Sequence, residues 1–438
     1  MRLLRDEADF HLFLSRFTNY ERLVRYDYDR KTLGPDRTRA LLRAIGEPHT
    51  AYPSIHIAGT KGKGSLALML EALLSALGRR VGTYTSPHVE HLRERIRIEE
   101  RPIEGAALVT EMNKLLPYLE TRSSENGEFP TFFEIMTALA MEAFRSRSVD
   151  WGIFEVGLGG RLDATNVLEP RSTAITSIGL EHTRQLGDTL ARIAAEKAGI
   201  IKPGIPVIAG PIPPEAEEVI RATATRRRAP LTIIGEPLVH HAAPGSLLVE
   251  GHREPFPCGP VLGPALRWNL TIALTIIREL ERDLGTTLDR SALQNALLRL
   301  RLPARCEIIA STPLVVIDGA HTAESIRALR VALDEAGFPT PRTVVVSTGR
   351  DKRLEAIAAE LHALGDRFIC TCADAQRSFD PAAIRAALGC GDCVTDPHDA
   401  LRRAREHGDA VVVTGSFYLA GVLRPAVLRQ SAEVSSNG

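Results

Sequence analysis

The sequence has no excess of either charge, because Lys and Arg together number 54 of its 438 residues and Asp and Glu together also number 54. Nucleic acids and anionic membrane surfaces are usually bound through a basic excess, so we expect neither as a partner. No apolar run approaches the roughly 18–20 residues that span a bilayer. The N-terminus is charged from Arg2 onward and lacks the apolar core of a signal peptide. These absences predict a cytoplasmic protein.

Cysteine is also scarce. Six cysteines in a chain of this length do not form a disulfide framework. The pairs Cys370/Cys372 and Cys390/Cys393 resemble a zinc site only loosely, because a single residue separates the members of the first pair. Ordinary reduced thiols are the favoured interpretation, and a zinc site is the alternative.

The segment Ile57–Ser65 has the composition of a phosphate-binding loop. An apolar run ending at Ala58 predicts a buried strand, a glycine-rich turn follows, and Leu66–Leu77 favours a helix. This arrangement can hold the phosphates of a nucleotide, since glycines let backbone N–H groups approach them and the helix N-terminus adds partial positive charge. Lys63 can neutralise β- and γ-phosphate oxygens. We therefore predict that the protein uses ATP.

The loop departs from the common G-x-x-x-x-G-K-[ST] pattern. Ile57 stands where that pattern has its first glycine, and Gly64 separates Lys63 from Ser65. A flexible turn between a strand and a helix is the alternative interpretation.

Predicted strands and helices alternate along most of the chain, which implies a mostly parallel sheet covered on both faces. The length favours two domains with a break near Leu302 and Pro303. Between about residues 229 and 260, the short β-like runs Leu231–Ile234 and Ser246–Val249 predict a separate, small β-rich excursion. The other predicted strands are Ser54–Ala58, Arg80–Tyr84, Trp151–Val156, Thr173–Ile178 and Pro206–Ala209 before the break, and Pro313–Ile317, Arg342–Ser347, Arg367–Cys370 and Ala410–Thr414 after it.

Three polar residues, Ser86, Glu155 and His182, each stand at or just beyond the carboxyl end of a different predicted strand. Ligands bind at this edge of open α/β sheets. A hydroxyl, a carboxylate and an imidazole suit a Mg²⁺ ion that keeps some waters and binds ATP oxygens. The alternative is that these are ordinary turn residues and strand caps.

Three charged residues carry weaker signals. Lys197 is predicted in the last turn of a helix, where a lysine is normally a solvated charge. Arg305 follows the predicted break, and Asp318 follows a predicted strand. An arginine can bind phosphate and an aspartate can accept from ribose hydroxyls. A linker salt bridge and a strand-end turn are the alternative.

Taken together and in this order, the motifs resemble the folylpolyglutamate synthase/dihydrofolate synthase family of the Mur ligase superfamily. The likeness extends from about Phe17 to Leu423. Its markers are Ala58–Ser65, Tyr84–His88, Glu94–Ile96, Thr131–Glu134, Glu155–Asn166, Glu196–Gly204, Asp318–His321, Gly349–Lys352 and Thr414–Tyr418. The resemblance implies an α/β protein with a P-loop ATPase domain of the Mur ligase type over residues 1–302, built on a mostly parallel sheet. Residues 303–438 would form a smaller, Rossmann-like glutamate-ligase domain.

The resemblance also implies roles for individual residues. ATP would be held by Gly59, Thr60, Lys61, Gly62, Lys63, Gly64, Ser65, Asn269, Arg305 and Asp318. Mg²⁺ would be held by Ser86, Glu155, His182 and Lys197, the last after carbamylation by CO₂, which could serve a second Mg²⁺. Substrates would contact Glu94, Arg95, Phe133, Asp163, His321 and Ser416. The side chains implied in catalysis are Lys63, Lys197, His182 and His321.

The implied enzyme is an ATP-dependent amide ligase. It would add L-glutamate to dihydropteroate, to the glutamate tail of (tetrahydro)folate, or to both, through an acyl phosphate that closure of the domains protects from water. A monomer is expected.

The chain departs from the family pattern at Lys61, Glu181, Leu266, Ala304 and Thr322, where the family usually has Asn, Asp, Gln, Gly and Asn. These departures motivate an alternative, a paralogous ligase that joins an amino acid to a different carboxylate. A nucleotide-binding switch without ligase chemistry is a third hypothesis, which the retained residues of the implied catalytic set disfavour.

Overall fold

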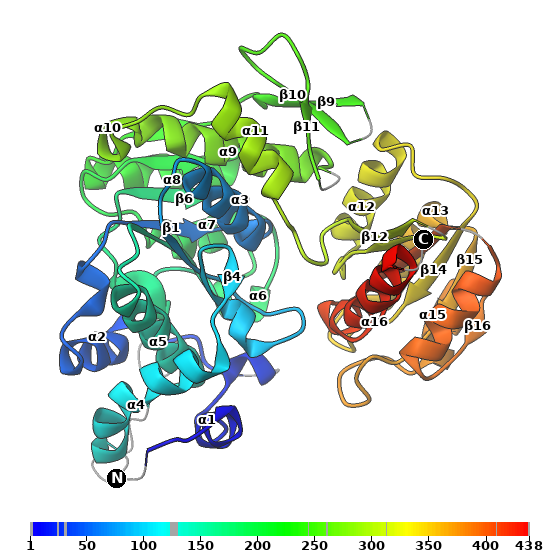
Figure 1. The fold of residues 1–438 in the computed structure, drawn as a ribbon, viewed down its shortest axis with the longest axis horizontal. Coiled ribbons are helices and arrows are strands. Elements are labelled where there is room, and N and C mark those ends of the chain that lie inside the picture. Colours follow the sequence, from blue (N-terminus) through cyan, green and yellow to red (C-terminus); the bar gives the residue numbers. More distant parts are fainter. Residues whose placement is uncertain are drawn as a thin grey trace. The chain divides into compact units, whose positions relative to one another are not determined.

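The computed structural model describes residues 3–23, 26–29, 33–122, 130–243, 245–259, 262–311, 313–408 and 410–436 (Figure 1). The chain divides into two compact units, called here the first and the second unit. The first comprises Met1–His88, Leu92–Pro237 and Trp268–Ala296, and the second comprises Val89–His91, Leu238–Arg267 and Leu297–Gly438. The domain break near residue 302 was predicted from the sequence, and it stays a prediction.

The described residues of the first unit form an eight-stranded sheet in the order β4-β3-β2-β5-β1-β6-β7-β8. The strands from β2 to β8 in this order pair in parallel, while β3 and β4 pair antiparallel at one edge. The central strands β1 and β5 are buried along their whole length, as expected for a parallel sheet that is covered on both faces. The strands are β1 (Ser54–Ala58), β2 (Val81–Tyr84), β3 (Ile96–Ile98), β4 (Arg101–Pro102), β5 (Trp151–Glu155), β6 (Ser172–Ile175), β7 (Val207–Ala209) and β8 (Leu231–Ile233).

Helices connect these strands and bury their apolar sides in two clusters, one around α4 and α5 and one around α7 and α8. The helices are α1 (Glu7–Leu14), α2 (Pro35–Ala44), α3 (Lys63–Ala76), α4 (Gly105–Arg122), α5 (Phe132–Ser146), α6 (Thr183–Leu186), α7 (Leu190–Ala198), α8 (Pro214–Arg227), α9 (Pro264–Glu279), α10 (Glu281–Leu284) and α11 (Arg290–Arg299). Short 3₁₀ turns lie at Tyr20–Arg22, Pro48–Thr50, Leu92–Arg95 and Ala164–Val167. Of these helices, α9 and α11 have residues in both units.

One prediction about the strands is wrong. Leu231–Ile233 is not part of a separate β excursion, because it pairs in parallel with β7 and forms the edge of the main sheet. The short apolar run could not show which sheet it joins, since strand pairing is decided by contacts distant in sequence. The other predicted run, Ser246–Val249, is confirmed as β10, and it forms a three-stranded antiparallel sheet with β9 (Val239–Ala243) and β11 (Phe256–Pro257), which the sequence did not predict individually.

The second unit contains, within its described residues, a six-stranded sheet in the order β12-β13-β17-β14-β15-β16. All pairs are parallel except that β12 runs antiparallel to β13. The strands are β12 (Glu307–Ser311), β13 (Leu314–Ile317), β14 (Arg342–Val346), β15 (Arg367–Cys370), β16 (Asp392–Cys393) and β17 (Ala410–Thr414). The helices are α12 (Ala323–Glu335), α13 (Leu354–Leu364), α14 (Pro381–Leu388), α15 (Pro397–Glu406) and α16 (Phe417–Ser436).

Alternate residues of this second sheet lie in two separate buried clusters. Val316 and Val344 belong to the cluster that includes α12, α13 and α14, whereas Val315 and Val345 belong to the one that includes α15 and α16. This is the pattern of a sheet with helices on both faces, since neighbouring side chains of a strand point to opposite sides. The predicted α/β class, with a mostly parallel sheet and a separate C-terminal α/β unit, is confirmed.

Among the described helices, none is both long and apolar enough to cross a membrane.

Candidate functional site

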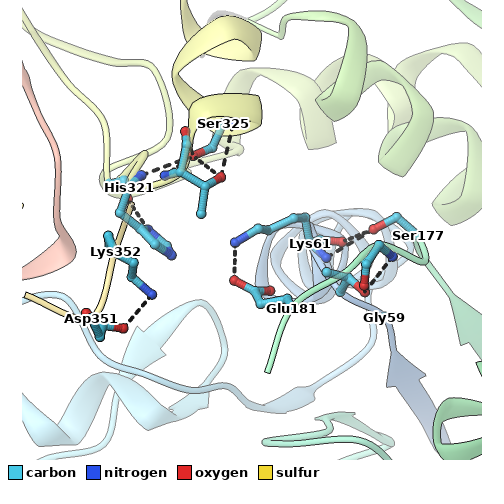
Figure 2. Close-up of polar contacts among 12 residues, drawn as sticks. Gly59, Lys61, Ser177, Glu181, His321, Ser325, Asp351 and Lys352 are labelled. Carbon is cyan, nitrogen blue, oxygen red and sulfur yellow. Dashed lines mark hydrogen bonds and ion pairs between the residues drawn. The ribbon is translucent and has the colours of Figure 1, made fainter. Parts of the chain in front are cut away.

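The glycine-rich loop after β1 is tied to the end of β6 through its backbone (Figure 2). The carbonyl of Lys61 accepts from the hydroxyls of Thr176, at 2.6 Å, and Ser177, at 3.1 Å. The N–H of Lys61 donates to the Ser177 hydroxyl at 3.0 Å, and the N–H of Thr60 donates to the Ser177 carbonyl at 2.8 Å. The sequence analysis did not single out Thr176 and Ser177. The feature of the sequence that could have indicated them is a pair of consecutive hydroxyl side chains at the end of a predicted central strand.

Two further carbonyls of the loop are held by side chains from distant helices. The Lys197 ammonium in α7 donates to the carbonyl of Gly59 at 2.8 Å. The amide of Asn269 in α9 donates to the carbonyl of Gly62 at 3.1 Å. Lys197 and Asn269, both predicted to lie at the site, therefore contact the loop itself.

Two glycines of the loop leave no room for a side chain. A Cβ at Gly59 would lie 1.9 Å from the Thr176 hydroxyl oxygen. A Cβ at Gly62 would lie 2.5 Å from the Asn269 amide nitrogen, and Gly62 also has a φ of +86°. Only glycine meets both conditions of contact and backbone geometry.

Helix α3 begins directly at the end of the loop, and its N-terminus has no side-chain cap among the described residues. Gly62 occupies the N-cap position. The first N–H groups of a helix have no acceptor within the helix, so those following Gly62 can bind an anion. Lys63 begins the helix and Ser65 is buried within its first turn. The arrangement matches the predicted phosphate-binding loop.

Lys197 is buried, with 4% of its surface exposed. A lysine in the last turn of a helix is normally solvated, and the structure differs because the end of α7 packs behind the loop. Burial, together with repulsion by Lys63 and Lys61, lowers the pKa of Lys197 to about 7 against the attraction of Glu181 and Asp163. A large fraction of this amine is therefore neutral near neutral pH.

Lys61 forms an ion pair with Glu181, which follows β6 (Figure 2). Burial alone would raise the pKa of Glu181, but Lys61, with smaller effects of His182 and Lys63, lowers it to about 2. Glu181 is thus a permanent carboxylate beside the loop. The next residue, His182, has a left-handed backbone with a φ of +51° and precedes α6.

The predicted metal ligands Ser86 and Glu155 lie together. The N–H of Ser86 donates to a carboxylate oxygen of Glu155 at 2.9 Å, and Glu155 is buried at the end of β5. His182 stands on the segment that binds Thr60 through Gly179, whose N–H donates to the Thr60 hydroxyl at 3.0 Å.

Asp163 holds its own loop together. Its carboxylate accepts from the N–H and the hydroxyl of Thr165, at 3.0 and 2.6 Å, and from the N–H of Leu158 at 3.0 Å. It is buried, which raises its pKa against these hydrogen bonds. Its predicted contact with substrate stays a prediction.

The other predicted substrate residues of the first unit lie near β2 and β3. Arg95 is almost fully buried and forms two hydrogen bonds with the Glu21 carboxylate, at 2.7 and 2.6 Å, and one with His88 at 3.0 Å. The half-buried Phe133 packs against Tyr84, with ring centroids 5.8 Å apart. Glu94 is half-buried in the turn before β3.

In the second unit, Asp318 and His321 follow β13. The Asp318 carboxylate accepts from the N–H groups of Cys306, at 2.6 Å, and Ala320, at 2.7 Å. Burial raises the pKa of Asp318 to about 6, and these hydrogen bonds and Arg305 only partly oppose the rise. His321 Nδ1 lies 2.8 Å from the carbonyl of Gly319.

Ser416 and Arg305 lie near this cluster. Ser416 follows β17, the parallel neighbour of β13, and its hydroxyl accepts from the N–H of Leu419 at 3.1 Å. The Arg305 guanidinium lies over the ring of Phe417, 5.3 Å from its centroid. The carboxyl edge of the second sheet therefore gathers Arg305, Asp318, His321 and Ser416.

The same edge also carries residues for which the sequence predicted no role. Lys352 and Asp351 form an ion pair at 2.9 Å in the segment after β14 (Figure 2). Among the described residues, no group of three or more His, Cys, Asp and Glu side chains is placed to hold a metal ion. None of the six cysteines forms a disulfide, and the zinc alternative gains no support because no such metal-holding group includes them among the described residues.

Comparison with known proteins gives one family. The model of the Mur ligase glutamate ligase domain matches residues 304–417. The dihydrofolate synthase/folylpolyglutamate synthase of Bacillus subtilis is 33% identical over 409 residues, which cover 89% of this chain and 94% of that protein. A probable bifunctional folylpolyglutamate synthase/dihydropteroate synthase of Haloferax volcanii is also 33% identical, and the chain spans 48% of its length.

Solved structures agree with these relatives. The folylpolyglutamate synthase of Mycobacterium tuberculosis, complexed with ADP and AMPPCP, has a TM-score of 0.84 and 30% identity, with coverage of 96% of this chain and 98% of that one. The bifunctional synthase of Yersinia pestis, complexed with AMPPNP and a Mn ion, has a TM-score of 0.80 and 26% identity, with coverage of 98% and 99%.

Proposed function

Because this chain belongs to the folylpolyglutamate synthase/dihydrofolate synthase family, we propose that it is an ATP-dependent ligase that adds L-glutamate to dihydropteroate, to the glutamate tail of (tetrahydro)folate, or to both. The observation that carries this function is the loop Gly59–Ser65, whose carbonyls are tied to β6, α7 and α9 while the N-terminus of α3 has no side-chain cap among the described residues.

The reaction proceeds in two transfers. A carboxylate oxygen of the pterin substrate attacks the γ-phosphorus of ATP, and the bond to the β,γ-bridging oxygen breaks, which gives an acyl phosphate and ADP. The amine of L-glutamate then attacks the acyl carbon, inorganic phosphate leaves with the C–O bonding pair, and the amine loses a proton. Lys63 and the N–H groups of α3 stabilise charge on the transferring phosphoryl group.

The donor set of the first unit fits Mg²⁺. Glu155 has a buried carboxylate that accepts from the N–H of Ser86, and His182 lies on the segment after β6 that contacts Thr60 of the loop. A bound Mg²⁺ would take the carboxylate and hydroxyl oxygens and the imidazole nitrogen as ligands, and would complete its shell with water and phosphate oxygens. When bound, the ion neutralises phosphate charge. The other residues act by positioning: Thr176, Ser177 and Asn269 fix the loop backbone.

Lys197 is suited to carbamylation, because a neutral amine reacts with CO₂ to give a carbamate and a proton. Its lowered pKa, caused first by burial, supports this chemistry. Isotopic labelling tests it: protein equilibrated with ¹³C-bicarbonate gives a carbamate carbon signal that is missing in Lys197→Met. Absence of the signal in the wild type contradicts the modification and, with it, a second Mg²⁺ held by Lys197.

The ligase itself is tested by Mg-ATP-dependent incorporation of labelled L-glutamate, run separately with dihydropteroate and tetrahydrofolate. Incorporation that Lys63→Ala abolishes establishes the ligase and shows which step it performs. A folded protein that binds ATP but incorporates glutamate into neither acceptor favours the alternative, a paralogous ligase acting on another carboxylate. Whichever acceptor it uses, we expect the protein to be a cytoplasmic monomer.

The alternative has one structural observation behind it. Thr322, where the family usually has Asn, caps α12 together with Ser325, whose N–H donates to the Thr322 hydroxyl at 3.3 Å. The Thr322 hydroxyl therefore holds the helix, and threonine has no side-chain amide to offer to an incoming amino acid. Screening other amino acids and carboxylates by ADP release separates the two functions.

A further inference from the structure

The ion pair between Lys61 and Glu181 joins the middle of the phosphate loop to the segment that follows β6 (Figure 2). Both residues depart from the family pattern, and the structure shows that they contact each other. The two departures from the family pattern are therefore one feature, an ion pair.

The side chain of Lys61 is not needed to shape the loop. Its carbonyl and its N–H are already held by Thr176 and Ser177. These contacts use only backbone atoms of residue 61, so they do not depend on a lysine side chain. The ammonium group is consequently available for a separate task.

The ammonium lies in a cluster of like charges. Lys61 and Lys63 both repel a positive charge on Lys197, while Glu181 attracts it and also interacts with Lys61 and Lys63. Without a bound anion, Glu181 offsets part of this repulsion. A nucleotide brings several negative charges to the same loop, and these compete with Glu181 for the Lys61 ammonium.

The pair can exchange partners at low cost. The side chain of Lys61 is 42% exposed and that of Glu181 is 20% exposed, so water reaches both. An ion pair between partly exposed groups contributes little to stability. A lysine also has a flexible stem and three N–H donors, which allows its ammonium group to move between acceptors.

We propose that Glu181 is a positioning residue that holds the Lys61 ammonium in the nucleotide-free protein in the place of a phosphate group, and that a nucleotide polyphosphate takes Lys61 over from Glu181 when it binds. The proposal rests on the nucleotide binding of the proposed function. It makes Lys61 a second phosphate-binding lysine beside Lys63, and it makes Glu181 an internal competitor of the nucleotide.

The proposal predicts opposite effects for the two halves of the pair. Calorimetric titration of the full chain with ADP, in EDTA so that neither metal nor turnover contributes, should give an affinity about tenfold weaker for Lys61→Ala, the loss expected for a charge-assisted hydrogen bond. Glu181→Gln should bind ADP about threefold more tightly, since no ion pair must be broken. The double variant should equal Lys61→Ala, because Glu181 acts through Lys61.

Matched controls separate this role from a structural one. Arg221→Ala and Glu217→Gln make comparable changes in an ion pair on α8 and should leave ADP affinity unchanged. Lys61→Arg keeps the charge and should stay within about twofold of the wild type. The swapped variant Lys61→Glu/Glu181→Lys can restore an ion pair but puts a carboxylate on the loop, so it should bind ADP more weakly than Lys61→Ala.

The outcomes are distinct. Weaker binding by Glu181→Gln, or wild-type binding by the swapped variant, would show that the pair only shapes the loop and would overturn the proposal. Unchanged binding by Lys61→Ala would overturn it as well. If the wild-type protein binds no ADP, both this proposal and the proposed ATP-dependent function are wrong. If it binds ADP but incorporates no glutamate, only the proposed function is wrong.

Discussion

The two units hold their candidate sites by different means. In the first unit, the loop after β1 is fixed by hydrogen bonds to residues far away in the sequence, such as Lys197, 138 residues from Gly59, and Asn269, 207 residues from Gly62. In the second unit, Asp318 accepts from Ala320, two residues away, and from Cys306, twelve residues away.

This difference indicates how each site responds to change. The first site forms only when β1, β6, α7 and α9 are assembled, so a substitution in any of them should change the affinity for the ligand. In the second site, the Asp318 carboxylate is held by N–H groups close to it in the sequence, while longer-range contacts join the carbonyl of Ala320 to Thr414 and Gly415 at the end of β17. A defect there should first change the local stability.

The largest effect is expected at Lys63. Replacing it with Ala should lower kcat/KM for ATP by about 10²- to 10³-fold, because a charge aimed at the transferring phosphoryl group is lost. Its half-exposed position predicts little change in the thermal midpoint. Glutamate incorporation and thermal unfolding measure the two quantities, with Arg221→Ala as the control. A variant that retains a tenth of the wild-type activity would remove Lys63 from the catalytic set.

A second prediction sharpens the role of distant contacts. Gly62 and Gly78 have similar positive φ values, +86° and +75°, but a Cβ at Gly78 meets nothing within 4 Å, whereas one at Gly62 meets Asn269. Backbone strain from Ala should cost roughly 1–2 kcal/mol at either position, and the close contact with Asn269 should add to this cost at Gly62. Gly62→Ala should in addition weaken ADP binding at least about tenfold. Urea unfolding and ADP titration test this, and equal ADP affinities in both variants would contradict it.

In the second unit, the stability should depend on the charge of Asp318. Its folded-state pKa, about 6, is raised above its ordinary value of 3.8, so the folded protein keeps a proton that the unfolded chain has lost. Between about pH 4 and pH 6 this group therefore makes stability fall as the pH rises. Asp318→Asn should remove that part of the slope. Denaturant unfolding across this range compares the two, and identical slopes would contradict the shift.

The smallest effects should distinguish two helix caps. Thr131 and Glu134 form a buried capping box at α5, and Thr322 and Ser325 form a half-buried one at α12. Thr131→Ala should cost about 2 kcal/mol and Thr322→Ala about 1 kcal/mol, since the groups left without a partner are better shielded from water at Thr131. Urea unfolding measures both, and a larger loss at Thr322 would reverse the comparison.

Much of the fold could be predicted from local patterns. The strand before Gly59 and the helix after it are contiguous in the sequence, so apolar runs, glycines and Lys63 predicted the loop together with its place between β1 and α3. The family was predicted from the order of such motifs, and the comparisons confirm it. The roles of individual site residues stay predictions.

What the sequence could not show was pairing over long distances. Leu231–Ile233 was assigned to the wrong sheet, because a short apolar run does not identify its neighbour. Lys197 would be a solvated charge by its helical position alone, and it is buried because the end of α7 packs against the loop, where Lys197 donates to the carbonyl of Gly59.

The sequence by itself determined the elements, the phosphate loop and the family, because each depends on residues close together along the chain. The tertiary structure decided which side chains surround the loop: it joined Lys61 to Glu181, buried Lys197 and brought Asn269 to Gly62. The physical reason is that the charge and the burial of a group depend on neighbours in space. Those neighbours are fixed only when the strands of the sheet take their order.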